Sequence, residues 1–311
     1  MAPVPSCRCA QASGSRGGCC DVSTAAQRQW TRLAASPWFA SVHEVLERLP
    51  GDRLPTLEEL NALASERGVA SGGGTPLRFV SAAARADDRK QQYEICIHGS
   101  GEVETRPNSW HDLFNALVWL AFPRTKATLN RLHHDAIKRW QGEARSGRGT
   151  ARDVLTLFDE GGMIVACTDP LLGDLLRSFR WRDLFWWRRA DVTAQMRFRV
   201  FGHAILEHAL APYKAVTAKA LIVDIDCRAL ELPDARLNAL LDARAAAYFE
   251  RPEALASTRT LHPLPVLGIP GWTAANEDPR YYEDTTVFRP GRKAARECSV
   301  PLGREHKKQA P

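Results

Sequence analysis

Apolar residues recur every three or four positions along much of the chain, and this period predicts amphipathic helices. The clearest apolar face consists of Trp110, Leu113, Phe114, Leu117 and Ala121. Pro123 should end or kink this helix, because proline has no amide hydrogen and its ring crowds the preceding turn. A second helix is predicted over 124–141, and others over 27–49, 57–68, 201–210 and 233–251.

Short alternating or continuous apolar runs predict a smaller β component. Strands at 77–80 and 93–98 are expected, with 102–106 pairing back as a hairpin. A second hairpin is expected from 154–158 and 163–168, around the turn sequence D-E-G-G. The run A-L-I-V-D-I-D predicts a buried strand at 220–226, and the prolines in 261–272 predict an irregular, rigid loop.

Together these elements predict an α+β fold, a predominantly helical single domain with two short β-hairpins. Strands and helices do not alternate along the chain, which argues against a doubly wound sheet. The first residues, 1–25, are predicted to form a disordered arm rich in Cys, Gly and Ser. One domain should span 26–293, with the polar linker 142–150 as a candidate internal boundary, and 294–311 should be a basic flexible tail.

Composition is that of an ordinary globular protein, with 44% hydrophobic and 25% charged residues. The longest uninterrupted apolar run, 116–122, is far shorter than the ~20 residues that a membrane-spanning helix needs. The start of the chain lacks the apolar core of a signal peptide. We therefore expect a cytoplasmic protein without membrane contact, and the sequence leaves its oligomeric state open.

The eight cysteines predict neither a disulfide framework nor a metal centre. Four of them lie within the first 20 residues as C-x-C and C-C pairs, a spacing that matches no reliable zinc pattern. The others, Cys96, Cys167, Cys227 and Cys298, should be reduced and pack as small core residues. No metal ligand is assigned and the cofactor is unknown; a divalent metal is compatible with the sequence but is not indicated by spacing.

The net charge of +6 permits an anionic partner without requiring one. Residues 177–199 combine seven arginines with six aromatic residues, a mixture that suits phosphate contact together with base stacking. The predicted nucleic-acid contacts are Arg180, Arg182, Arg188 and Arg189. The alternative is that the aromatic rings belong to the core while the arginines extend into solvent.

Side chains capable of catalysis are densest in 106–135. His111 and Asn115 share one face of the first helix, and Lys126 and Asn130 share one face of the second with His133 or His134. A bend between the helices would bring a base, two amides and an ammonium group together, which are the components of a general-base or phosphate-handling site. The competing interpretation is structural: these groups satisfy buried hydrogen bonds or form the solvent-exposed face of an amphipathic helix.

Outside this stretch, His203 and Glu207 lie four residues apart on a predicted helix. They could act as a base with its orienting carboxylate, as half of a metal site, or as an ordinary hydrogen-bonded pair. Ligand contacts are predicted from Arg106, Trp110, Arg124, His133 and Trp272.

A family resemblance covers much of the chain. The run W-H-D-L-F-N-A-L-V-W-L-A-F-P-R-T-K-A at 110–127 resembles the signature of the bacterial domain of unknown function 3025. Shorter segments agree in the same order: L-T-L-F-D-E-G-G at 155–162, F-G-H-A at 201–204, P-L-P-V-L-G-I-P-G-W at 263–272 and F-R-P at 288–290. The resemblance implies one bacterial domain and no particular chemistry.

Two functions are therefore compared. In the first, the protein is a hydrolase acting on a phosphate ester or nucleic acid. His111 is the base, Asn115 and Asn130 are orienting residues, and Lys126 or Arg124 holds the anion. His203 and Glu207 complete that site. A hairpin followed by a helix also outlines a His-Me nuclease, although the required spacing is not met. In the second function, the protein binds nucleic acid or another anionic partner without catalysis, and the 106–135 motif is structural.

Overall fold

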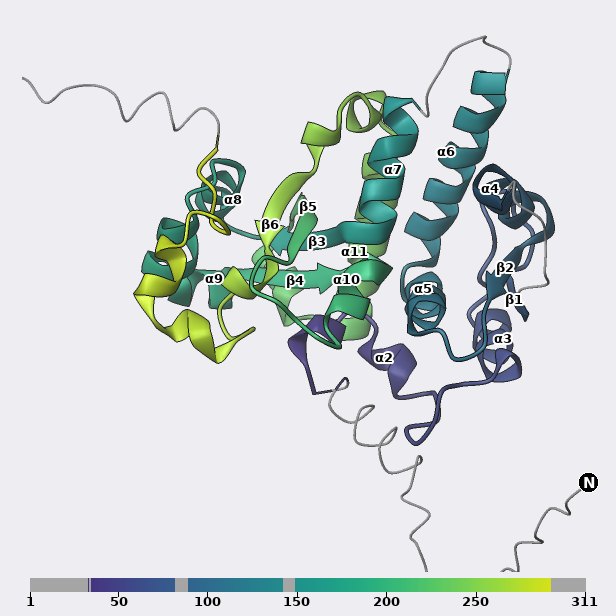
Figure 1. The fold of residues 1–311 in the computed structure, drawn as a ribbon, viewed down its shortest axis with the longest axis horizontal. Helices are drawn as coiled ribbons and strands as arrows, with labels where there is room; N and C mark the ends of the chain where they lie inside the picture. The colour runs from purple at the N-terminus through teal and green to yellow at the C-terminus, as the bar shows by residue number, and fades with distance from the viewer. Residues whose placement is uncertain (1–32, 34, 82–88, 142–148, 292–311) are drawn as a thin grey trace, which may run out of the picture.

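The structure is a computed structural model that describes residues 33, 35–81, 89–141 and 149–291 (Figure 1). The predicted arm and tail lie outside the described residues, as does most of the predicted linker. Buried apolar side chains from Leu33 to Phe288 form a single hydrophobic cluster. The fold is α+β and mainly helical, as predicted. No helix in the described ranges has the length and apolarity required to cross a membrane.

Helices make up most of the fold. They are α2 (His43–Leu46), α3 (Leu57–Glu66), α4 (Arg89–Ser100), α5 (Trp110–Ala121), α6 (Pro123–Gln141), α7 (Thr150–Gly161), α8 (Pro170–Arg177), α9 (Arg189–Gln195), α10 (His203–His208) and α11 (Asp234–Phe249). The predicted capping box at the start of α3 is present, with the Thr56 hydroxyl accepting from the Glu59 amide and the Glu59 carboxylate accepting from the Thr56 amide.

The larger sheet has the strand order β4-β3-β5-β6. Its central strand β3 (Gly162–Cys167) is buried throughout and runs parallel to β5 (Thr217–Asp224). The strands β4 (Met196–Val200) and β6 (His262–Pro265) are antiparallel to β3 and β5, respectively. Helices α7 and α11 pack against this sheet and separate it from α6 (Figure 1).

The smaller sheet lies on the other side of α6. Its two strands, β1 (Arg78–Ser81) and β2 (Glu102–Thr105), are parallel. Helix α4 connects them and packs against α6, and α3 packs against β1 (Figure 1).

Both predicted hairpins are wrong. Residues 93–98 lie inside α4 rather than in a strand, so the hairpin outline of a His-Me nuclease is absent. Residues 154–158 lie inside α7, and D-E-G-G ends that helix and begins β3. Val154, Leu155 and Phe158 are buried. The apolar run is therefore the core face of a helix, and a short run of this kind cannot be told from a strand by its period alone.

The segment 261–272 is partly regular, contrary to prediction. Residues His262–Pro265 form the edge strand β6. Proline is tolerated on an edge strand because one side of that strand needs no amide donor. The prediction that the scattered cysteines are core residues holds for Cys167, which is buried, but not for Cys227, which is exposed.

Pro123 begins α6 as well as following the end of α5. Proline fits the first position of a helix because that position needs no amide donor. The next two amides, of Arg124 and Thr125, donate to the Asp242 carboxylate of α11 at 3.0 and 2.7 Å. A negatively charged carboxylate at this position also interacts favourably with the positive N-terminal end of the helix dipole. This cap fixes the direction in which α6 leaves α5, and so positions Lys126.

Candidate functional site

His111 lies in the first turn of α5, which begins where the Ser109 hydroxyl accepts a hydrogen bond from the Asp112 amide. Its two ring nitrogens meet different partners. The Nδ1 atom is 2.7 Å from Glu207 Oε2, and the Nε2 atom is 3.1 Å from His203 Nε2. The His111 side chain is 34% exposed, so this ring is accessible from solvent, whereas His203 is buried. The two predicted histidines thus meet, although 92 positions separate them in sequence.

Helix α10 supplies both His203, its first residue, and Glu207, one turn later. The sequence predicted that Glu207 would orient His203, but Glu207 contacts His111 of α5 instead. Close backbone packing places the start of α10: the amides of Phe201 and Gly202 both donate to the Gly162 carbonyl, at 3.0 and 2.8 Å. A Cβ atom on Gly202 would lie 2.4 Å from the Glu160 carbonyl oxygen, so only glycine fits there.

Glu160 is the cluster residue that sequence reasoning missed. It lies in the last turn of α7, and its Oε2 atom is 3.2 Å from His203 Nε2. One ligand atom each from His111, Glu160 and His203 lies within 4.8 Å of the others, close enough to share a metal ion. The available signal was the motif D-E-G-G, which was interpreted as a hairpin turn rather than as the end of a helix.

Behind His203, a buried polar network leads into the core. His203 Nδ1 lies 3.9 Å from Asp159 Oδ2, and Asp159 Oδ1 accepts from Lys126 Nζ at 2.5 Å. The same ammonium group donates to Asn115 Oδ1 at 2.8 Å, and Asn115 Nδ2 is 3.2 Å from the Tyr93 hydroxyl. Lys126 and Asn115 are therefore both behind the histidine pair rather than beside it.

The charges of this network are set by burial and by Lys126. Burial lowers the pKa of His203 to about 4, so the ring is neutral at pH 7. Burial by itself raises the pKa of Asp159, but the charge of Lys126 and the hydrogen bond from its ammonium group outweigh it and hold that pKa below its usual range. Burial also raises the pKa of Tyr93 well above its usual range. At neutral pH, Asp159 is thus the ionised member of the network that faces His203.

Asn130 belongs to a separate arrangement on α6. Its Nδ2 atom donates to the Glu94 carboxylate at 2.8 Å and to the Glu94 carbonyl at 3.0 Å, and its Oδ1 accepts from the Gly72 amide at 3.1 Å. Burial raises the pKa of Glu94 to about 7, which the Asn130 hydrogen bond partly offsets. Asn130 thus joins α6 to α4 and to the loop at Gly72, and does not contact the histidine pair.

The predicted ligand contacts are dispersed. Arg106 is exposed and donates to Asp112, the residue after His111. Trp110 packs against Phe114. Arg124 is exposed at the start of α6, whereas His133 is buried on the same helix.

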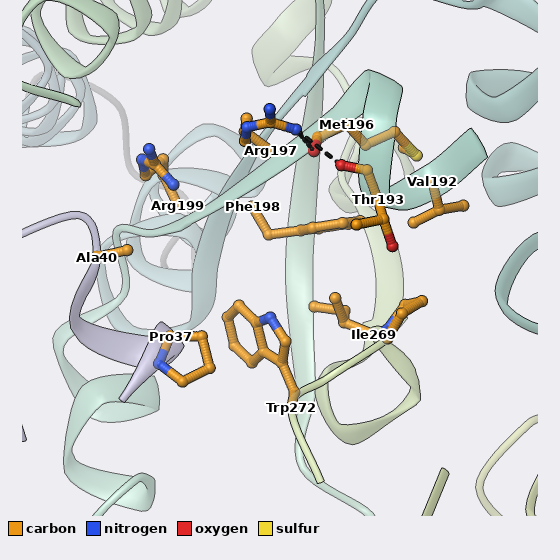
Figure 2. A pocket seen from close by; sticks show the side chains of 11 residues that line it. Pro37, Ala40, Val192, Thr193, Met196, Arg197, Phe198, Arg199, Ile269 and Trp272 are labelled. Atoms are coloured by element: carbon orange, nitrogen blue, oxygen red, sulfur yellow. Dashed lines mark hydrogen bonds between the residues drawn. The ribbon is translucent and has the colours of Figure 1, made fainter. Parts of the chain in front are cut away.

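Trp272 lines a different cavity, a pocket of about 230 Å³ between the segment at Pro37 and strand β4 (Figure 2). Phe198 and Ile269 line it with Trp272. The guanidinium of Arg197 donates to main-chain carbonyls (Figure 2), and that of Arg199, also in the lining, donates to Asn238. The described histidine cluster is not part of this pocket.

The arginine-rich segment pairs with acidic residues of the same chain. Arg180 contacts Asp183, Arg182 contacts Glu283, Arg188 contacts Asp191, and Arg189 contacts Glu277. The aromatic rings divide between core and surface: Trp181 and Phe185 are buried, whereas Trp187 is 66% exposed. The alternative from sequence, in which aromatic residues enter the core, therefore holds for part of the segment.

The fold and the cluster define a mainly helical α+β protein with a histidine–carboxylate centre where three helices meet. Residues 77–292 match the family described as "Protein of unknown function (DUF3025)". Because this match spans more than half of the chain, the protein belongs to that family. The matched range contains His111, Glu160, His203 and Glu207. No curated protein and no solved structure matches the chain.

Proposed function

We propose that the protein is a hydrolase that acts on a phosphate ester or nucleic acid, with His111 as the base that activates water. The observation that supports this most is the short contact between His111 Nδ1 and Glu207 Oε2, 2.7 Å. A carboxylate that accepts from one imidazole nitrogen selects the tautomer in which the other nitrogen is free to take a proton. That other nitrogen, Nε2, lies at the partly exposed centre of the cluster.

His203 and Glu160 complete the reaction centre in this proposal. The neutral ring of His203 adds a second polar nitrogen 3.1 Å from His111 Nε2, and Glu160 adds a carboxylate oxygen 3.2 Å from His203 Nε2. The buried network behind His203 positions that ring. Lys126 and Asn115 are positioning residues here, because the ammonium group is already bound by Asn115 and Asp159.

Arg106 is the group that we assign to anion contact. Its side chain is 64% exposed and is held by Asp112, which sits next to His111 in the first turn of α5. An exposed guanidinium group fixed by one carboxylate keeps N–H donors available for phosphate oxygens. Arg124 is less suited to the role, because the Asp242 carboxylate lies at its backbone amide.

The non-catalytic alternative has weaker support. Each of the four arginines proposed to bind nucleic acid already forms an ion pair with a carboxylate of the same chain. Phosphate binding would have to replace these contacts, which reduces the gain from counterion release. The exposed ring of Trp187 is the feature of that segment that still favours base stacking.

The test is hydrolysis by the purified full-length protein, with and without added divalent metal. Substrates are p-nitrophenyl phosphate, bis(p-nitrophenyl) phosphate and single- and double-stranded nucleic acid, with p-nitrophenyl acetate as the non-phosphate comparison. His111→Gln should reduce the rate by ~100-fold or more, the contribution typical of a general base. Glu207→Gln should reduce the rate less, because the imidazole ring of His111 remains.

The matched control is His208→Gln, on the same helix as His203 but in contact with Tyr213. It should retain full activity. The proposal fails if no phosphate substrate is cleaved under any condition, or if His111→Gln cleaves as fast as the unaltered protein.

A further inference from the structure

We infer that His111, Glu160 and His203 together bind a divalent first-row transition-metal ion. The three residues come from the start of α5, the end of α7 and the start of α10, and their ligand atoms lie within 4.8 Å of one another. Imidazole nitrogen and carboxylate oxygen are ligand types that such ions prefer. Sulfur is absent from this set, which disfavours soft ions such as Cu(I).

The distances fit the coordination sphere of such an ion. Ligands about 2.0–2.1 Å from a tetrahedral ion lie roughly 3.4 Å apart, and ligands at adjacent octahedral positions lie roughly 3 Å apart. His203 Nε2 is 3.1 Å from His111 Nε2 and 3.2 Å from Glu160 Oε2. Two of the three ligand pairs thus already have the spacing that one ion would impose, and the third pair lies within 4.8 Å.

A carboxylate lies near the Nδ1 atom of each ring, and the one beside His111 is close enough to determine which nitrogen of that ring carries the proton. Glu207 lies 2.7 Å from His111 Nδ1, and Asp159 lies 3.9 Å from His203 Nδ1. The Glu207 contact favours a proton on His111 Nδ1 and leaves the lone pair of that ring on Nε2, whereas Asp159 is too far from His203 Nδ1 for a hydrogen bond. A bound cation requires the lone pair of His203 on Nε2 as well, where a proton would otherwise be shared with His111 or Glu160.

The local charge also favours a cation. The carboxylates of Asp159, Glu160 and Glu207 surround the two rings, and Lys126 provides one positive charge against them. The three carboxylates and the one ammonium group leave a formal charge of −2, which a divalent ion neutralises. On the His111 ring, the contact with Glu207 gives the carboxylate–histidine–metal arrangement that commonly orients metal-binding imidazoles.

Three protein ligands leave coordination positions open for water or substrate. With the ion bound, His111 Nε2 is a ligand and no longer the base. A metal-bound water loses its proton near neutral pH, so the ion would then supply the nucleophile for hydrolysis. The binding of the ion rests on the geometry alone, whereas its role in activating water rests on the proposed function.

The experiment is calorimetric titration of Zn²⁺ into the chelator-treated, full-length protein. Thiolates are zinc ligands in general, so all variants carry Cys7→Ser, Cys9→Ser, Cys19→Ser and Cys20→Ser to exclude the four cysteines of the first 20 residues. We expect one tightly bound ion per chain. Glu160→Gln should weaken binding by ~100-fold or more, since loss of even an outer hydrogen-bond partner costs about 10–100-fold.

Two features keep the result interpretable. Glu160 is a suitable ligand to change because its side chain is 48% exposed, so the fold should survive, as circular dichroism would verify. His208→Gln is the control and should bind Zn²⁺ normally. Replacing Zn²⁺ by Co²⁺ should give visible absorption bands without the near-ultraviolet charge transfer of thiolate ligands.

The inference is overturned if the serine background binds no Zn²⁺, or if Glu160→Gln binds it unchanged. Its failure is distinguishable from that of the proposed function. A tightly bound ion without phosphate hydrolysis would remove the hydrolase and leave the metal site. Hydrolysis by a protein that binds no Zn²⁺ in the titration would remove the metal site and leave the hydrolase.

Discussion

At the scale of single residues, the two histidines of the cluster differ in exposure and therefore in role. His111 is reached by solvent, and its Nδ1 atom is held by Glu207. His203 is buried, and its environment is set by Asp159 and Lys126. The accessible ring is suited to chemistry, and the buried ring to a fixed position.

Lys126 carries the clearest residue-scale prediction. Its ammonium group is buried and bound to Asp159 and Asn115. Lys126→Met would leave the Asp159 charge without its partner, and breaking a buried pair in this way typically costs about 3 kcal/mol. Urea denaturation should therefore show a free energy of unfolding lower by about that amount.

The control for this change is Lys138→Met, which removes an exposed ammonium group from the same helix. It should alter stability by less than about 0.5 kcal/mol. Adding Asp159→Asn to Lys126→Met should recover part of the loss, because the unpaired charge is then removed. A loss below about 1 kcal/mol for Lys126→Met would contradict a buried, paired ammonium group.

At the scale of elements, the cluster depends on the junction between α7, β3 and α10. The Gly162 carbonyl accepts from two consecutive amides just before α10. Gly202 has φ −63 and ψ 116, which any residue can adopt, so space rather than backbone conformation demands glycine. This contact sets the distance between Glu160 and His203.

Gly202→Ala tests that dependence. Its Cβ atom would meet the Glu160 carbonyl oxygen at 2.4 Å and the Gly162 nitrogen at 2.5 Å. The start of α10 must therefore move away from α7, at a cost of about 1–3 kcal/mol for overpacking. We expect weaker Zn²⁺ binding and a lower melting temperature.

Gly161→Ala is the matched control one residue before β3. Its Cβ atom would meet nothing closer than the Lys219 side chain at 3.7 Å, an ordinary contact. Stability and Zn²⁺ affinity should both be retained. Equal effects of the two substitutions would show that the close approach at Gly202 does not position the cluster.

At the scale of the whole molecule, Glu94 links stability to pH. Burial raises its pKa to about 7 in the folded protein, above the ~4.3 of an unfolded glutamate. The folded state therefore holds this proton more tightly than the unfolded state. The resulting stabilisation is fully present below the unfolded pKa and is lost as pH rises through the folded pKa.

Glu94→Gln should remove this pH dependence. The amide cannot ionise, and its oxygen can still accept from Asn130. Thermal melts should show the variant to be more stable than the unaltered protein at pH 8, by on the order of 3–4 kcal/mol, with little difference below about pH 4. Glu58→Gln, at an exposed position, should show no such trend. A variant less stable at pH 8 would contradict a buried, ionising carboxyl group at position 94.

The sequence by itself determined the features that depend on local geometry. The 3.6-residue period predicted α5, α6, α10 and α11, and side-chain capping predicted the start of α3. Long, strongly periodic segments carry this signal, whereas short apolar runs do not, which is why both hairpins were mispredicted. The sequence also named His111, His203 and Glu207 as candidates, because each lies on a clearly amphipathic helix.

Only the tertiary structure decided which of these side chains meet. Glu207 was expected to serve His203 on its own helix, but it contacts His111 on α5. Glu160 joined the cluster because α7 continues through D-E-G-G and ends against Gly202. Spacing within one helix depends on neighbouring residues alone. The approach of α5, α7 and α10 depends on long-range packing around β3, which no local pattern encodes.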